Sequence, residues 1–500
     1  MFLWYNIEKN AAGKDRKRMN LKKRIIAVLV TVGLCISIAS CSSSKNQDEE
    51  TEEPLVAETV EEIAEALRAD YTEDETAKEK IEELRASFAD LRETDALAFT
   101  VSSENGKITV TGYTGSDSSV RVPTEIQGLP VTAIADAAFA GKSTLKKLYL
   151  PDSIQAIGKG ILSDCSSLTA LRTPLLGADD SAEQFLGYLF EAEKYIDNPS
   201  TVPPSLEYLE LGGDDQKLTD YALFDCNDLI CVMLPSSMTE LGSYSLYYCG
   251  SLLAINTEHL TKISAHALDS CFSLTVLEFG ANLTSVGIGA LEGCIGLRNL
   301  TLPFVGGSAT EHTYLGYLFG AETPDFSKGY YPPYLTSVTL LSTCKQLGNY
   351  AFYECEPLLS VTLPDFLQTV GVRAFAGCLR LTQLQIPESV TEIRENACFG
   401  CISLENVTFE GSSKLATIGV NAFYRCSALR SVTLPKSLKE IPASCFADCL
   451  NLEFIDLGGA QAVGKNAFRH CQSLNSLVAL PEVTFEEGNR NAEALLNQDK

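Results

Sequence analysis

Hydrophobic positions recur along most of the chain with a period of 22–25 residues, longer than a single helix or strand requires. Within most periods, a six-residue stretch follows the pattern L-x-x-φ-x-φ, where φ is hydrophobic, as in Leu145, Leu148 and Leu150. This pattern predicts a short β-strand whose first, fourth and sixth side chains face a core. One such unit cannot bury its own hydrophobic face, so the periodicity predicts a solenoid in which neighbouring coils cover each other.

The number of coils follows from the leucines that open these stretches. Steps between consecutive leucines are 22, 23 or 25 residues, apart from two steps of 38 residues. We therefore expect an α/β solenoid of about 14 coils over residues 136–480, with one parallel β-sheet and short helical or 3-10 segments opposite it. The opening leucines are Leu145, Leu168, Leu206, Leu229, Leu252, Leu274, Leu297, Leu335, Leu358, Leu381, Leu404, Leu429, Leu452 and Leu474.

Each long step contains a copy of the same unusual segment. Residues 186–206 read "LGYLFEAEKYIDNPSTVPPSL" and residues 315–335 read "LGYLFGAETPDFSKGYYPPYL", with ten identical positions. They predict matched insertions near 175–205 and 304–334, in which LGYLF forms a helical turn docked on the solenoid.

The second insertion carries a candidate contact of its own. Tyr330, Tyr331 and Tyr334 surround two prolines, and we expect a rigid aromatic loop with little entropy to lose on binding. The alternative is that these tyrosines pack onto the adjacent coil.

The segments that flank the repeats have other patterns. Residues 97–135 alternate apolar and polar positions and predict an N-terminal β cap. Residues 55–96 place apolar side chains at three- and four-residue steps, which predicts a helical stalk, with self-association through residues 55–95 left open. Residues 41–54 predict an acidic tether, and residues 481–500 form a polar tail that is not an evident cap.

Residues 1–40 have the pattern of a signal peptide. Three basic residues, 22–24, precede an apolar run over 25–38, which is shorter than the about 20 residues that span a bilayer. Met19, followed by "NLKKR", is a more natural start than Met1, and whether residues 1–18 are translated is left open. The run ends in Ile38-Ala39-Ser40-Cys41, which resembles the lipobox of bacterial lipoproteins.

The lipobox resemblance implies that Cys41 carries a lipid anchor. Two acyl chains hold a protein stably on a membrane, whereas one chain is marginal. We therefore expect an extracytoplasmic protein that is lipid-anchored to the bacterial cell membrane. An ordinary cleaved signal peptide is the alternative.

The repeated unit resembles a known family. The pattern "L-x-x-L-x-L-P-x-s-v-t-x-I-G-x-x-A-F-x-x-C-x-x-L" is similar to the BspA-like leucine-rich repeats of bacterial surface proteins, and the match covers about residues 98–480. The resemblance implies an α/β leucine-rich-repeat solenoid at the cell surface, with adhesion to host or neighbouring-cell ligands in several members. Two departures are Lys142, at a cysteine position, and Cys398, at a phenylalanine position.

Charge and motifs narrow the function further. The net charge is −26, and residues 99–500 carry −19 of it, so a phosphate backbone would be repelled and we expect no nucleic-acid partner. The four histidines are isolated, and G-x-S-x-G and H-E-x-x-H are absent from the sequence. "GAQAVGK" at 459–465 lacks the Ser/Thr of a phosphate-binding loop, because Asn466 follows it. We expect no enzyme activity, no cofactor and no metal site.

Eleven of the seventeen cysteines occupy one position of the repeat. A regular solenoid stacks them with parallel side chains, which is poor geometry for disulfides. We expect reduced thiols that pack as small core residues. They are Cys165, Cys226, Cys249, Cys271, Cys294, Cys355, Cys378, Cys401, Cys426, Cys449 and Cys471.

The third and fifth strand positions face away from the core. Over much of the array they are small and uncharged, which suits a glycan or a peptide backbone, although Ser and Thr are also ordinary exposed strand residues. The ligand-binding candidates here are Asn299, Thr301, Ser337, Thr339, Ser360, Thr362, Gln383 and Gln385. We expect a surface protein that binds an extracellular protein or glycan; the alternative is a structural envelope spacer or self-assembling component.

Overall fold

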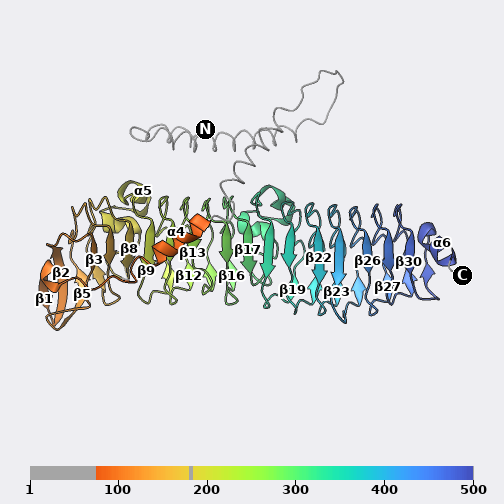
Figure 1. The fold of residues 1–500 in the computed structure, drawn as a ribbon, viewed down its shortest axis with the longest axis horizontal. Coiled ribbons are helices and arrows are strands. Elements are labelled where there is room, and N and C mark those ends of the chain that lie inside the picture. The colour runs from red at the N-terminus through yellow and green to blue at the C-terminus, as the bar shows by residue number, and fades with distance from the viewer. Residues whose placement is uncertain (1–74, 180–183, 499–500) are drawn as a thin grey trace, which may run out of the picture. The chain divides into compact units, whose positions relative to one another are not determined.

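The computed structural model describes residues 75–179 and 184–498. They form a parallel β-solenoid of about 16 turns, with strand β1 near one end and helix α6 at the other (Figure 1). The count exceeds the expected 14 coils because the rows of strands continue into both flanking segments. Strand β3 lies in the predicted N-terminal cap, and strand β31 lies in the predicted C-terminal tail.

The first row of strands follows the predicted leucines. Each strand begins two residues after an opening leucine, and β3 (Ser119–Arg121) extends the row at its N-terminal end. The row comprises β6 Lys147–Tyr149, β8 Ala170–Thr173, β9 Tyr208–Leu211, β11 Cys231–Met233, β13 Ala254–Ile255, β15 Val276–Glu278, β17 Asn299–Leu302, β18 Ser337–Leu340, β20 Ser360–Thr362, β22 Gln383–Ile386, β24 Asn406–Phe409, β26 Ser431–Thr433, β28 Phe454–Asp456 and β30 Ser476–Val478.

The sequence predicts one continuous parallel sheet, but the row is divided into three hydrogen-bonded sheets. They run from β3 to β13, from β15 to β20 and from β22 to β30. The first break coincides with the 22-residue step from Leu252 to Leu274, one residue shorter than most. All pairs within the three sheets are parallel, as expected for coils of one hand.

A second row of two-residue strands lies on another side of the coils. Regular coils therefore return through short strands and turns, and 3-10 helices replace the turn in the two insertions. These strands are β7 Ala156–Ile157, β10 Lys217–Leu218, β12 Glu240–Leu241, β14 Lys262–Ile263, β16 Ser285–Val286, β19 Gln346–Leu347, β21 Thr369–Val370, β23 Glu392–Ile393, β25 Thr417–Ile418, β27 Glu440–Ile441, β29 Ala462–Val463 and β31 Thr484–Phe485.

The core is built from ladders of identical side chains. The opening leucines are buried throughout, and phenylalanine rings stack in parallel between coils, as between Phe423, Phe446 and Phe468. The fifteen described cysteines are buried free thiols, as predicted. Most of those at the repeat position donate S–H to a backbone carbonyl of the preceding coil, for example Cys249 to Leu223 at 3.2 Å.

The two insertions share one frame, as predicted. LGYLF forms a 3-10 helix in both, η2 (Leu186–Phe190) and η4 (Leu315–Phe319), with the two leucines of each buried. The glycine is required because a Cβ at Gly187 would lie 2.5 Å from the Asn198 Oδ1 atom, and one at Gly316 would lie even closer to Ser327. Beyond η2 the chain forms η3 (Tyr195–Asp197) and α5 (Asn198–Thr201), and beyond η4 it forms η5 (Pro324–Gly329).

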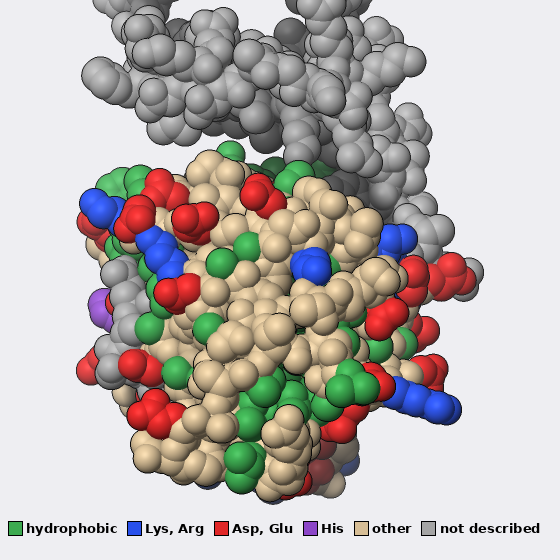
Figure 2. All heavy atoms as spheres, turned by 90° about the vertical axis from the view of Figure 1, so that its left-hand side faces the viewer, with side chains coloured by type: hydrophobic (Ala, Val, Ile, Leu, Met, Phe, Trp, Pro, Cys, Tyr) green, Lys and Arg blue, Asp and Glu red, His purple; other side chains and the backbone are tan. Residues whose placement is uncertain are grey.

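The N-terminal end is closed by the predicted β cap. After η1 (Ala96–Ala98), strands β1 (Phe99–Glu104) and β2 (Lys107–Tyr113) form a hairpin, and β4 (Glu125–Ile126) and β5 (Leu129–Ile134) form a second one. Strand β5 then pairs in parallel with β7, which starts the second row. Acidic side chains lie around the margin of this end (Figure 2).

The C-terminal tail is also a cap, so the expectation of a mere polar tail is wrong. Helix α6 (Arg490–Gln498) follows β31 and buries Ala492 against the last coils. The buried Asn489 side chain accepts a hydrogen bond from Phe468 N and donates to the Gly464 and Glu486 carbonyls. A polar residue therefore satisfies the backbone of the terminal coil, which explains why hydrophobicity does not reveal this cap.

The cysteine ladder predicts a clear difference in thiol reactivity. Burial raises the pKa of Cys249 and Cys294 to about 12 and that of Cys165 to about 11, so thiolate is scarce at neutral pH. We expect these thiols to resist alkylation in the folded protein and to react fully in denaturant, as measured by mass spectrometry of the peptides. Thiols that stay blocked in denaturant until a reductant is added would instead show disulfides.

The phenylalanine ladder predicts a position-specific loss of stability. Phe446 is fully buried between two rings, so Phe446→Ala should destabilise the solenoid by about 3–5 kcal/mol. Phe366 is 64 % exposed, and Phe366→Ala is the matched control with little expected effect. Denaturant midpoints measure both; equal midpoints for the two variants would contradict the ladder.

Candidate ligand-binding face

The side of the first strand row that faces away from the core is divided into two halves. Helix α4 (Glu75–Arg85) and the turns after it lie over strands β6 to β13 (Figure 1). This position corrects the predicted stalk: the apolar stripe at Ile81, Leu84, Phe88 and Leu91 is real, but it packs on the solenoid. Residues 55–74 lie outside the described residues.

The contact beneath α4 is a small hydrophobic core. Leu84 and Phe88 are buried against Ala170, Tyr208 and Cys231, and the Phe88 ring lies 5.9 Å from that of Tyr208. Burying two such side chains stabilises the contact by about 1.5–3 kcal/mol each. The segment is therefore part of the folded body.

Polar contacts fix the same segment at both ends. Lys80 forms an ion pair with Glu207 at 2.8 Å, and this hydrogen bond raises the lysine pKa. Further along, Lys147 Nζ donates to the Ser87 carbonyl, and Arg121 donates to the Leu91 carbonyl. The bulky strand residues of this half, which could suggest a binding surface, thus hold an internal segment.

A charged cluster completes the covered half. The buried Arg172 guanidinium donates to Asp152, Glu210 and the Leu150 carbonyl, and it lies 4.5 Å from the Tyr149 ring centroid. The Tyr208 hydroxyl donates to Glu210, and burial raises the pKa of that hydroxyl. Because every group here has an internal partner, we assign the cluster to structure.

From β15 onward, the residues of the same face are exposed or half-buried; both are half-buried in β18 and β28. Third- and fifth-position residues are buried in β8 and largely buried in β9 and β11, whereas they are exposed in β15, β22 and β26. Nine strands, β15 to β30, make this open face, which is roughly 40 Å long at about 4.8 Å per strand.

The structure places six of the eight predicted face residues in one sheet and the two glutamines in the next. Asn299, Ser337 and Ser360 are register partners across β17, β18 and β20, and so are Thr301, Thr339 and Thr362. On β22, Gln383 pairs with Asn406 and Gln385 pairs with Thr408. The Gln385 amide donates to Glu410, so its hydrogen-bonding capacity is partly used.

The chemistry of the open face is that of neutral hydrogen bonding. From Asn299 to Thr433, the third and fifth positions carry only hydroxyl and carboxamide groups, each of which can donate and accept. At the ends of the face the rows hold charged and apolar residues instead: Val276 and Glu278 on β15, Phe454 and Asp456 on β28, and Val478 on β30. Such a surface can form hydrogen bonds to a sugar ring or a peptide backbone along its length.

The second insertion differs from its prediction at one tyrosine. Tyr331 is buried: its hydroxyl donates to the Tyr353 carbonyl at 2.9 Å, and its ring packs edge-on against Phe319. It is a packing residue, so its assignment as a ligand contact is wrong. Tyr330 is 42 % exposed and the Tyr334 ring lies beneath the Arg298 guanidinium at 5.6 Å.

The most exposed aromatic residue of this insertion is Phe326, at 67 %. It lies in η5 beside Tyr330, and together they form an apolar tip that sequence reasoning missed. The first insertion has a comparable tip at Ile196, which is 59 % exposed. The exposure of Phe326 was not predictable from the repeat because it depends on how η5 leaves the coil.

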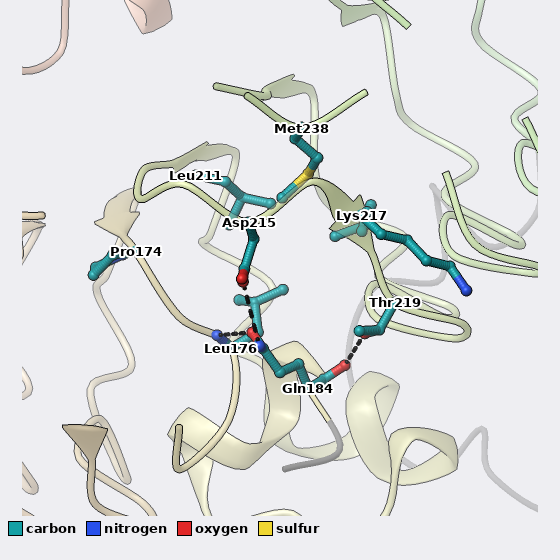
Figure 3. Close-up of a pocket in the computed structure, with 9 residues that line it drawn as sticks. Pro174, Leu176, Gln184, Leu211, Asp215, Lys217, Thr219 and Met238 are labelled. Carbon is teal, nitrogen blue, oxygen red and sulfur yellow. Dashed lines mark hydrogen bonds between the residues drawn. The ribbon is translucent and has the colours of Figure 1, made fainter. Parts of the chain in front are cut away.

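A cavity near the first insertion is too small for a ligand. It measures about 10 Å³, the space of about one water molecule. Gln184 closes the cavity with three hydrogen bonds (Figure 3). Its side-chain amide accepts from Leu176 N and donates to Asp215, and its backbone carbonyl accepts from the Thr219 hydroxyl.

The repeat sequence now identifies the family. A family model described as a BspA-type leucine-rich repeat region matches residues 119–198, 201–311, 327–453 and 408–489, which is more than half of the chain. The chain belongs to the BspA-type leucine-rich-repeat family. Proteins of this family are bacterial cell-surface proteins and generally serve as scaffolds for interaction or adhesion.

Solved structures of similar proteins are leucine-rich-repeat proteins as well. A leucine-rich-repeat protein from Bacteroides ovatus is 18% identical, with a TM-score of 0.31, over 78% of this chain and 98% of that one. A leucine-rich cell-surface protein from Faecalibacterium prausnitzii is 17% identical, with a TM-score of 0.29, over 80% and 96%. The pneumococcal vaccine antigen PcpA is 17% identical, with a TM-score of 0.26, over 81% and 95%.

Comparison with curated proteins gives no significant match. Within the residues that the structure describes, none of the helices has the length and apolar content needed to cross a bilayer. The predicted signal peptide, the acidic tether and Cys41 of this BspA-type protein lie outside the described residues.

The α4 contact predicts a selective change in thiol exposure. Cys231 lies under α4, and burial raises the pKa of its thiol. The double substitution Leu84→Asp/Phe88→Asp puts two carboxylates into the hydrophobic contact and should detach α4 from the strands. Cys231 should then be alkylated, while the core thiol of Cys249 stays protected. The control is Leu97→Asp at a residue that is 89 % exposed. An unchanged Cys231 in the double variant would show that α4 does not cover it.

Proposed function

We propose that this BspA-type protein is a lipid-anchored surface adhesin that binds an extracellular protein or glycan through the open face of β15 to β30. The observation that carries the proposal is the division of one strand face by α4. The covered half buries its bulky residues under the protein's own segment, whereas strands β17 to β26 of the open half present neutral polar side chains.

The apolar tip of the second insertion supports the same function. Phe326 and Tyr330 expose aromatic surface, and Tyr334 lies against Arg298, which directly precedes β17. Aromatic anchors are enriched among the residues that dominate binding energy. We place Tyr330 and Phe326 as a second contact for a long ligand.

The lipid anchor at Cys41 completes the proposal. An anchor ahead of residue 75 would hold the solenoid at the bacterial cell surface, the location shared by the family. Self-association through residues 55–95 has less support, because the stripe from Ile81 to Leu91 is already buried on the solenoid. The alternative function is that of a structural spacer that binds no ligand. It is less favoured because it assigns no role to the open face.

A binding screen with matched variants tests the proposal. The chain would be screened against glycan arrays, extracellular-matrix proteins and cell-wall fractions. Thr362→Arg/Gln383→Arg places two cations on the open face, and Gln368→Arg/Thr391→Arg places the same charges at exposed residues outside it. We expect the face variant to weaken binding at least about tenfold, as for loss of a binding hot spot, and the control to bind as the parent does.

Other outcomes separate the alternatives. Equal binding by both arginine variants, with loss in Phe326→Ser/Tyr330→Ser but not in Ile196→Ser, would move the site to the second insertion. Failure of the folded parent to bind any of the three ligand groups would contradict the proposal and favour the spacer.

A further inference from the structure

The edge of the solenoid that carries the insertions has a chemically distinct cluster. His266 and Asp269 lie in the turn of one coil, and Glu292 lies in the turn of the next. His266 Nδ1 is 3.0 Å from Asp269 Oδ2 and 3.5 Å from Glu292 Oε2, and one ligand atom from each residue lies within 4.8 Å of the others.

The cluster interrupts two columns of repeat positions. In the preceding coils one column holds Tyr221 and Tyr244, whose rings stack in parallel, and His266 stacks on Tyr244 at 4.9 Å. The other column holds Phe224 and Tyr247, also stacked, before Asp269 and Glu292. An aromatic edge thus changes within two coils to one imidazole and two carboxylates.

A glycine follows in each column: Gly289 comes after His266, and Gly320 comes after Glu292. Because glycine has no side chain, space remains beside the nitrogen and oxygen atoms that could bind a metal. A Cβ at Gly289 would lie 2.8 Å from His266 Nδ1 and 3.0 Å from Glu292 Oε2. A Cβ at Gly320, in the second insertion, would lie 2.7 Å from Glu292 Oε2. Any other residue at these two positions would fill the space that the three donors face.

The imidazole is held in place from outside the cluster. The Tyr244 ring covers one face of His266, and there is no room beside its Cε1 atom for a side chain at position 289, because a Cβ there would lie 2.6 Å from it. The Ser270 hydroxyl donates to Asp269 Oδ1, and the other oxygen, Oδ2, is hydrogen-bonded to His266 Nδ1 at 3.0 Å. Supports of this kind orient the ligands of metal sites.

Electrostatics favours a cation at this place. Two carboxylates approach one imidazole, at 3.0 Å and 3.5 Å from its Nδ1 atom, so acidic groups outnumber the single basic one. A divalent ion would neutralise this excess of negative charge. When a tetrahedral ion binds its ligand atoms at about 2.0–2.1 Å, those atoms lie roughly 3.3 Å from one another. The distances from His266 Nδ1 to the Asp269 and Glu292 oxygens, 3.0 Å and 3.5 Å, are close to this value.

We propose that His266, Asp269 and Glu292 bind a first-row divalent transition-metal ion, Zn²⁺ or Mn²⁺. Imidazole with two carboxylates suits these ions better than Mg²⁺ or Ca²⁺, which prefer oxygen alone. The ion joins two coils beside Gly320, where the second insertion docks through the Gly289 and Leu291 N–H groups. Three protein ligands leave a coordination position open to solvent.

Titration of the chelator-treated chain with Zn²⁺ and with Mn²⁺, followed by calorimetry, tests this site. We expect saturable binding at one ion per chain, weakened at least about tenfold by His266→Gln, Asp269→Asn or Glu292→Gln. His470 pairs with the Asp448 carboxylate on the surface, so His470→Gln is the matched control with unchanged affinity. Glu292→Gln is the decisive variant, because its side chain is 42 % exposed and the amide preserves its shape.

Thermal unfolding gives a second readout that does not require a known ligand. Metal should raise the melting temperature of the parent and of His470→Gln, and it should leave that of Glu292→Gln unchanged. No saturable binding of either ion by the folded parent would overturn the proposal. Binding that persists in all three ligand variants, or that falls equally in His470→Gln, would also overturn it.

Discussion

Lateral contact between coils is the constraint on which the whole molecule depends. A coil buries its leucines, its phenylalanine and its cysteine only against the coils before and after it. The S–H groups donate across the same junctions, from Cys249 to the Leu223 carbonyl for example, so core packing and hydrogen bonding both run along the array. Each end of such an array must therefore be closed by something other than another coil.

The two ends meet this requirement in different ways. At the N-terminus, two hairpins begin as antiparallel strands and pass into the parallel row through β5. At the C-terminus, α6 covers the last coil and Asn489 satisfies its backbone groups. The same logic explains α4: strands β8 to β11 present apolar and aromatic groups that a third segment of the chain must cover.

Covering only half of a face makes the two halves chemically different. The half beneath α4 is built from groups with internal partners, including Arg172 and Tyr208. The other half has no bulky apolar rows to hide, and its hydroxyl and carboxamide groups can exchange water for a ligand with little reorganisation. The insertions add exposed apolar residues at Ile196 and Phe326, and the His266 cluster lies beside Gly320 of the second insertion.

The features of the structure that recur in every coil were predictable from the sequence, and those that occur once were not. Strand starts, the reduced cysteine ladder and the rows from Asn299 to Gln385 follow from a period that fourteen leucines report independently. The docking of α4, the burial of Tyr331 and the capping role of Asn489 each occur once. They depend on long-range contacts, as between Phe88 and Tyr208, that no local period encodes. The His266 cluster was missed because its residues are 26 positions apart and look isolated in the sequence.

Hydroxyl-radical footprinting of the intact chain tests the central claim most directly, because it reports the solvent exposure of individual side chains. The account predicts slow oxidation of Phe88 and Tyr208 and fast oxidation of Phe326, with intermediate-to-fast oxidation of Val276 at the start of the open face. Oxidation of Tyr208 as fast as that of Phe326 would contradict it. The strand face would then be open along its whole length, and α4 would not define the binding surface.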